Sequence, residues 1–314
     1  LNSVNTLYDS MQSIAITLVL VLGLIILVIS VLYSGQVVMP MKEVAGSIAM
    51  ISSGDFNETM QITGYSEAED ISDKFNSMLS VLQNLEDARQ EFVSNVSHEL
   101  KTPITSVKVL AESLIGQENV PVELYQEFMV DINEELERMN KIINDLLTLV
   151  KMDKNASEVN ISEVNINEFL EAILKQLQPI ADKRNIEMIF ESVRSVTAQV
   201  DEVKLAMAFR NLIENAIKYN YDNGWVRVSL NADHKFFYLK VSDSGVGIPE
   251  ELQDSIFERF YRVDKARSRE TGGNGLGLAI TRNAILLHRG SIKVHSIEQK
   301  GTTFAVRIPL MYSE

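Results

Sequence analysis

The sequence has no cysteine among its 314 residues, which excludes a disulfide framework and any thiolate metal site. A cysteine-free chain is compatible with a reducing, mostly cytosolic location. Positive charge is also scarce, because 29 Lys and Arg stand against 43 Asp and Glu and give a formal net charge of −14. No local basic patch interrupts this acidic balance. The composition therefore argues against direct nucleic-acid binding and favours a protein partner.

Charged side chains are absent between Asp9 and Lys42. Within this stretch, residues 14–33 are apolar except for one Thr, one Gly and one Ser. Twenty residues at about 1.5 Å rise span the roughly 30 Å of a bilayer core. The pattern predicts a transmembrane helix over residues 14–34, and a buried core helix is the alternative.

Lys and Arg are missing from residues 1–41 and first occur on the C-terminal side of this helix, which favours a cytoplasmic C-terminus. We therefore expect a plasma-membrane protein with a single span in this sequence, held in membrane lipid, with its later domains in the cytoplasm. Removal of an initiator Met would not normally leave Leu1 as the first residue. A truncated or processed chain is expected, with residues 1–13 as the remnant of an extracytoplasmic region.

An amphipathic helix is predicted around His98. Apolar residues at spacings of three and four predict one buried stripe, formed by Phe92, Val96, Leu100, Ile104, Val107, Leu110 and Leu114. His98 lies about 200° round the helix from Val96 and therefore faces solvent. A surface histidine without a role is the alternative, but Glu99 can accept an imidazole proton and Thr102 lies one turn further on the same face. Pro103 lacks an N–H group and weakens the helix beside Glu99.

The segment Ser-His-Glu-Leu-Lys-Thr-Pro at residues 97–103 resembles the phosphoacceptor motif of sensor histidine kinases. This resemblance implies that His98 accepts the γ-phosphoryl group of ATP and that Glu99 acts as a general base. It also implies that Thr102 helps to position water when a phosphorylated partner is dephosphorylated. The implied partner is the receiver domain of a response regulator, which accepts the phosphoryl group on an Asp.

Two amphipathic stretches precede the histidine helix, near residues 37–51 and 71–85. Neither can bury its apolar stripe alone. They resemble a HAMP linker, for which we expect residues 37–87, and the matching positions are Pro40, Glu69 and the run Phe75-Asn76-Ser77-Met78. The resemblance implies a parallel four-helix coiled coil formed by two chains.

A two-helix hairpin is predicted over residues 88–152. The second HAMP helix continues into the histidine helix, the chain turns at residues 116–121, and a return helix follows over 122–151. The return helix carries its own stripe of Leu124, Phe128, Ile132, Leu136, Met139, Ile143, Leu146 and Val150. Such a hairpin leaves much apolar surface exposed, so we expect a homodimeric four-helix bundle with both copies of His98 outside. The polar residues 152–160 are expected to form a hinged linker.

Helical and β-rich segments alternate in the last part of the chain, expected to be one domain over residues 160–312. Helices are predicted at 167–183, 201–220 and 277–289, and strands at 186–191, 225–231, 236–242, 291–296 and 302–308. The last four strands form hairpin-like pairs, which favours an α/β sandwich over a doubly wound parallel sheet. No Gly-x-x-x-x-Gly-Lys-Ser/Thr loop is present, so a P-loop fold is excluded.

Four clusters in this domain have a chemical interpretation. An Asn carbonyl suits Mg²⁺, a Lys or Arg suits phosphate, a strand-end Asp can accept the adenine amino hydrogen, and a glycine-rich helix start can bind phosphate. The clusters resemble the ATP-binding fold shared by histidine kinases, Hsp90-type chaperones and type II topoisomerases. The resemblance implies Asn215 as the Mg²⁺ ligand and an ATP site formed by Asn211, Asn215, Lys218, Tyr219, Asp243, Gly245, Gly247, Arg262, Gly273, Gly275, Leu276 and Gly277. It also implies that residues 248–272 act as a mobile lid.

Asn211 occupies the position where ATP-hydrolysing relatives of this fold carry a water-activating Glu. The γ-phosphoryl group is therefore expected to reach His98 and not water. The remaining histidines, His234, His288 and His295, have no motif or metal spacing and are interpreted as structural or surface residues. The predicted fold is multidomain, with a transmembrane helix, a dimeric coiled coil and four-helix bundle, and an α/β sandwich. An ATP-hydrolysing machine and a silent nucleotide-binding scaffold are the two alternatives.

Overall fold

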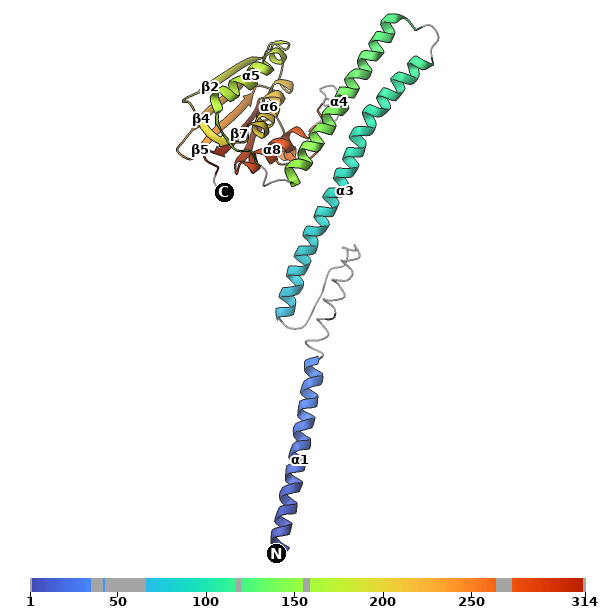
Figure 1. The fold of residues 1–314 in the computed structure, drawn as a ribbon, viewed down its shortest axis with the longest axis vertical. Coiled ribbons are helices and arrows are strands. Elements are labelled where there is room, and N and C mark those ends of the chain that lie inside the picture. The colour runs from blue at the N-terminus through green and yellow to red at the C-terminus, as the bar shows by residue number, and fades with distance from the viewer. Residues whose placement is uncertain are drawn as a thin grey trace. The chain divides into compact units, whose positions relative to one another are not determined.

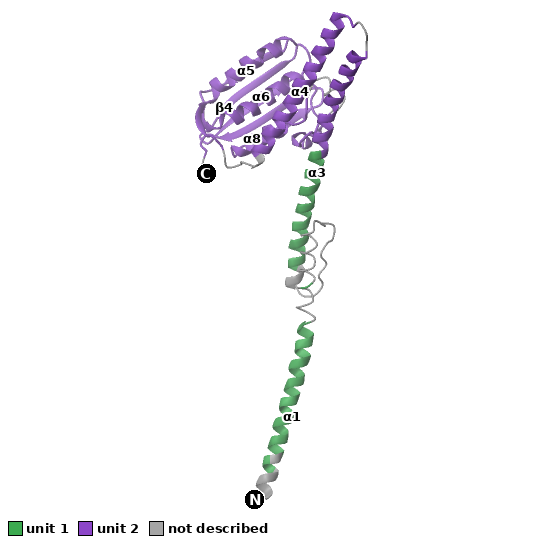
Figure 2. Ribbon diagram, turned by 45° about the vertical axis from the view of Figure 1, so that its right-hand side comes forward, with its two compact units in different colours: residues 1–93 green, residues 94–314 purple. Residues whose placement is uncertain are grey.

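The computed structural model describes residues 2–34, 42, 66–116, 120–154, 159–263 and 273–312. The chain divides into two compact units, residues 1–93 and 94–314 (Figure 2). The expected first HAMP helix, apart from residue 42, and residues 264–272 of the predicted lid lie outside the described residues.

Helix α1, Asn2–Tyr33, belongs to the first unit. Its part Ser10–Tyr33 is long and apolar enough to cross a membrane, and none of it is buried inside the protein. A soluble core helix would be mostly buried, so the exposed apolar surface agrees with membrane anchoring.

The predicted helical hairpin consists of α3, Ser66–Ile115, and α4, Val122–Lys154 (Figure 1). The expected continuity of the helix from residue 71 through His98 is confirmed. In the single chain the expected stripes are only partly covered. Ile104 is exposed, and on α4 the buried hydrophobic side chains are Ile142, Leu149 and Met152, whereas Ile143 and Val150 are exposed.

Helix α4 carries apolar side chains on more than one face. Leu149 and Met152 are part of the core of the following domain, and α4 packs against α8, Gly277–Leu287. Periodicity identifies an apolar stripe but does not say which neighbouring element covers it. Ile143 and Val150 remain on the surface of the single chain.

The last domain contains two sheets. A two-stranded antiparallel sheet pairs β1, Ser162–Asn165, with β3, Thr197–Val200. The main sheet has the order β2-β4-β5-β7-β6, with bounds Glu187–Ser192, Trp225–Ala232, Phe236–Asp243, Gly301–Pro309 and Ser291–Ile297. Only the β2–β4 pair is parallel. The predicted hairpins β4–β5 and β6–β7 are confirmed, whereas the β1–β3 pair was not expected.

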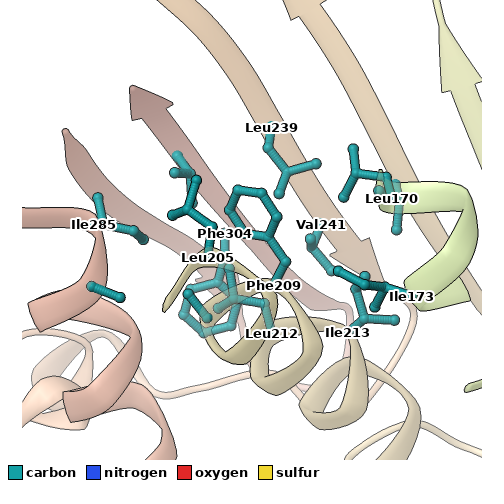
Figure 3. Close-up of a cluster of buried hydrophobic side chains, with 14 of the residues drawn as sticks. Leu170, Ile173, Leu205, Phe209, Leu212, Ile213, Leu239, Val241, Ile285 and Phe304 are labelled. Carbon is teal, nitrogen blue, oxygen red and sulfur yellow. The ribbon is translucent and has the colours of Figure 1, made fainter. Parts of the chain in front are cut away.

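Three helices cover one face of the main sheet: α5, Ile166–Asp182, α6, Glu202–Lys218, and α8 (Figure 3). Along β4 and β5, buried and more exposed side chains alternate, as expected when one face is covered. Phe209 of α6 is fully buried and belongs to the same hydrophobic core as Val241 of β5 and Phe304 of β7 (Figure 3). This arrangement confirms the predicted α/β sandwich.

Candidate functional site

His98 lies on α3 with 71% of its side chain exposed, as predicted. Its Nδ1 is 3.9 Å from Glu99 Oε1, too far for a hydrogen bond but close enough for a charge interaction. The hydroxyl of Thr102 donates to the His98 carbonyl at 3.2 Å. His98 is thus accessible to a large substrate group, with a carboxylate on its Nδ1 side.

An open groove of about 820 Å³ lies beside His98 on the hairpin. It runs between the two helices, and its lining includes Lys101, Thr102, Thr105, Asp131 and Glu134. The lining has both signs of charge and also includes the apolar side chains of Val109 and Leu110.

A second cavity, of about 340 Å³, brings most of the predicted nucleotide-site residues together. It is lined by the predicted residues Asn211, Asn215, Lys218, Tyr219, Asp243, Gly247, Arg262, Gly273, Gly275 and Gly277. Gly245 and Leu276 do not line it, because Leu276 is fully buried in the core and Gly245 packs against the backbone of Tyr219.

Asp243 stands at the end of β5, deep in this cavity. The backbone N–H groups of Gly245 and Thr302 both donate to its Oδ1, at 2.9 and 3.2 Å. Burial raises the pKa of Asp243 to about 6 despite these two bonds, which lower it. Oδ2 accepts no hydrogen bond from the described residues, so it is the oxygen available to a ligand.

The C-terminal end of α6 supplies the opposite, cationic side of the cavity. Burial and the charges of Lys141, Arg262 and Arg138 together lower the pKa of Lys218 to about 8, against a raising effect of Glu214. A side chain at Gly273 would come within 2.8 Å of Lys218 Nζ. The glycine therefore lets the loop before α8 approach the lysine closely.

That loop has a backbone that only glycine adopts easily. Gly275 has φ +71°, and its carbonyl accepts a hydrogen bond from Phe260 N–H at 3.0 Å. Helix α8 then starts at Gly277 without a side-chain cap at Leu276. Its first amide groups, beside the cavity, are donors for an anionic ligand. Asn211 Nδ2 donates to Gly277 O at 3.2 Å and joins α6 to this helix start.

The sequence reasoning missed Arg184, which follows α5. Its guanidinium donates to the carbonyls of Ile217, Lys218 and Asn220 at 2.7–2.9 Å and thereby holds the end of α6 that carries Lys218. Nothing near Arg184 in the sequence indicates this contact, because its partners are 33 to 36 residues away.

Two polar contacts in the site were also not predicted. Asn274 of the glycine loop is buried and donates to Asp145 of α4 at 2.6 Å. Lys141 of α4 pairs with Glu214 of α6 at 3.6 Å. Both α4 residues line the second cavity.

The remaining histidines fit their predicted structural or surface roles. His288 is buried, accepts the Asp201 N–H at Nε2 and lies 2.7 Å from Ala284 O through Nδ1. His234 and His295 are exposed.

Two family descriptions match the chain. Residues 88–155 match the His Kinase A (phospho-acceptor) domain, and residues 200–311 match the histidine kinase-, DNA gyrase B- and HSP90-like ATPase. The first contains His98, and the second contains Asp243 and Lys218. The second family is that of an ATP-binding domain.

Curated relatives extend the likeness over nearly the whole chain. The signal transduction histidine-protein kinase ArlS of Staphylococcus aureus is 32% identical over 309 residues, which cover 98% of this chain and 68% of the relative. The sensor protein kinase WalK of Staphylococcus epidermidis is 36% identical over 281 residues, 88% of this chain and 44% of that protein. The chain belongs to the sensor histidine kinases of two-component systems. It spans less than half the length of the WalK relatives.

Solved histidine kinases share the fold. The Acinetobacter baumannii histidine kinase AdeS is 23% identical with a TM-score of 0.56, covering 68% of this chain and 98% of that one. The histidine kinase ThkA, in a complex with the response regulator protein TrrA, is 24% identical with a TM-score of 0.59, covering 73% of this chain and 64% of the other.

Proposed function

We propose that this chain phosphorylates itself on His98 with Mg-ATP and passes the phosphoryl group to an Asp of a response regulator. The observation that supports the proposal best is the pairing of an exposed His98 with an anion-suited cavity in the same compact unit. Glu99 and Arg262, 3.8 Å apart, connect the two features.

In this proposal the cavity holds ATP with adenine at Asp243 and the phosphates toward Lys218 and Arg262. Oδ2 of Asp243 accepts the adenine amino hydrogen, and guanine has no such hydrogen at that place. The side-chain carbonyl of Asn215 would be a suitable oxygen ligand for Mg²⁺, which would supply positive charge to the phosphates. Lys218, Arg262 and the amides at the start of α8 neutralise phosphate charge.

The transfer step uses the Nε2 atom of His98, because Nδ1 lies on the Glu99 side. Nε2 attacks the γ-phosphorus, a P–N bond forms, and the bond from the γ-phosphorus to the bridging oxygen breaks and releases ADP. The proton on Nδ1 passes to Glu99. Water is not activated in this site, because position 211 carries an Asn whose amide is bound to Gly277 O.

The remaining proposals concern partners and domains. Apolar side chains exposed on the hairpin favour a homodimeric bundle: Ile104, Val109, Leu136, Ile143, Leu147 and Val150. The groove beside His98 is the proposed docking surface for the receiver domain. The proposed domains are an extracytoplasmic remnant (1–13), a plasma-membrane span (14–34), a HAMP linker (37–87), the phosphotransfer hairpin (88–152) and a cytoplasmic ATP-binding domain (160–312).

The test is transfer of label from γ-labelled Mg-ATP to the full chain, with His98→Gln as the variant and His295→Gln, an exposed histidine on β6, as the control. We expect acid-labile, base-stable label in the wild type and the control, and none in His98→Gln. Unlabelled protein that still binds ATP would instead favour a scaffold. Steady phosphate release independent of His98 would favour an ATP-hydrolysing machine.

Dephosphorylation of the phosphorylated regulator is a second proposed activity, supported by the position of Thr102 one turn from His98 in the open groove. Thr102→Ala should slow regulator dephosphorylation and leave self-phosphorylation intact. The control is Thr148→Ala, since Thr148 of α4 lies outside the groove and its hydroxyl likewise donates to the carbonyl four residues earlier. Unchanged dephosphorylation in the Thr102 variant would remove this role.

A further inference from the structure

The phosphotransfer hairpin contributes side chains to the nucleotide cavity itself. Lys141 and Asp145, one turn apart on α4, line this cavity together with Lys218 of α6. Asp145 accepts the 2.6 Å hydrogen bond from Asn274 in the glycine loop, and burial raises the pKa of Asp145. The cavity is therefore formed by two domains of one chain.

Lys141 is well placed to act on an anion in this cavity. It pairs with Glu214, which lies one helical turn before Lys218, at 3.6 Å. Its charge is, after burial, the largest influence that lowers the pKa of Lys218. Lys141 and Lys218 therefore lie close enough to repel each other, and a polyphosphate between them would relieve that repulsion.

The ion pair with Glu214 does not by itself explain why Lys141 lies at the cavity. The lysine side chain is 57% exposed, and a solvent-exposed ion pair of this kind contributes little to stability. Replacing Glu214 as the partner of Lys141 therefore costs little free energy, whereas a triphosphate offers several charged oxygens to this lysine. The hydrogen bond from Asn274 to Asp145 keeps the glycine loop beside the same turn of α4.

We propose that Lys141, on the phosphotransfer hairpin, binds the phosphates of ATP held in the cavity of the same chain. This inference rests on the proposed function, because it requires the second cavity to be the ATP site. It makes the hairpin part of the nucleotide site. Bound ATP then helps to hold the ATP-binding domain on the hairpin, and phosphate-free ligands do not.

The experiment measures binding of three ligands to the full chain: a non-hydrolysable ATP analogue, ADP and adenosine. Lys141→Met should weaken binding of the ATP analogue by about fivefold, the size of one partly exposed charge contact, and leave adenosine binding unchanged. Lys141→Arg should bind the analogue nearly as the wild type does. Lys151→Met, an exposed lysine ten residues further along α4, is the matched control and should change nothing.

Unchanged or tighter binding of the analogue in Lys141→Met would overturn the inference, and Lys141 would then serve only as the ion-pair partner of Glu214. Equal weakening of the analogue and adenosine would also overturn it, because it would indicate a general distortion of the cavity. Failure of the wild type to bind any of the three ligands would refute the proposed ATP site itself. The two failures are therefore distinguishable.

Discussion

The lowered pKa of Lys218 makes phosphate binding dependent on pH within an accessible range. Burial and neighbouring cations bring this pKa to about 8 in the free protein, against 10.5 for an ordinary lysine. Only the charged ammonium attracts phosphate, so a bound ligand raises the pKa of Lys218 again. The affinity for phosphate-bearing ligands is therefore maximal at pH values well below 8, and it falls as the pH rises through 8.

The size of the effect follows from the fraction of charged lysine. With a pKa of about 8, roughly nine tenths of the Lys218 side chains are charged at pH 7 and roughly one tenth at pH 9. The affinity for ADP should thus fall about tenfold between these two values, equivalent to about 1.4 kcal/mol. Adenosine carries no phosphate, and its affinity should stay constant over the same range.

The assay is equilibrium binding of ADP and adenosine to the full chain from pH 7 to pH 9.5. The result is reported as the affinity for ADP divided by the affinity for adenosine. Lys218→Met should give a low ratio that does not change with pH. Lys218→Arg, which stays charged, should give a high ratio that does not change. A wild-type ratio that changes less than about twofold between pH 7 and 9 would refute the reasoning, because the lysine would then titrate far above 8.

Three further predictions concern the same domain. Burial raises the pKa of Asp243 to about 6, so adenosine affinity should fall as the pH drops below 6 and the carboxylate gains a proton; an unchanged affinity at pH 5 would contradict adenine recognition by Asp243. Gly275→Ala, at φ +71° and against the Phe260 backbone, should weaken ATP-analogue binding roughly tenfold, measured by titration. Phe209→Ala, in the centre of the core, should lower the free energy of unfolding by about 3–5 kcal/mol, followed through the fluorescence of Trp225, the single tryptophan.

The helices were predictable because helical periodicity is local. The sequence spacing alone predicted continuous helix through His98, and α3 extends from Ser66 to Ile115. It also predicted His98 on the exposed side of that helix, since the angle between neighbouring side chains is fixed by the helix. The sequence did not say which element covers each apolar face of α4, because Ile142 and Ile143 are equally apolar and only the elements packed against them distinguish them.

The short β1–β3 pair could not be predicted for a similar reason. Its strands have four residues each, too few for a recognisable alternation, and Asn165 pairs with Thr197 across 32 positions of sequence. The contacts around the nucleotide cavity extend further still. Asn274 meets Asp145 across 129 residues, and no local pattern connects them.

The sequence by itself determined the elements and the residue types that carry chemistry, because helix period, strand alternation and short motifs depend on near neighbours. It determined an exposed His98 beside Glu99, a strand that ends in Asp243, and a glycine-rich helix start. The family resemblance assigned Asp243 and Lys218 to one site, but only the tertiary structure shows the cavity that they share and the contribution of Lys141 from α4. Burial and nearby charge shift the pKa of Lys218, and both depend on distances in space between residues far apart in the chain.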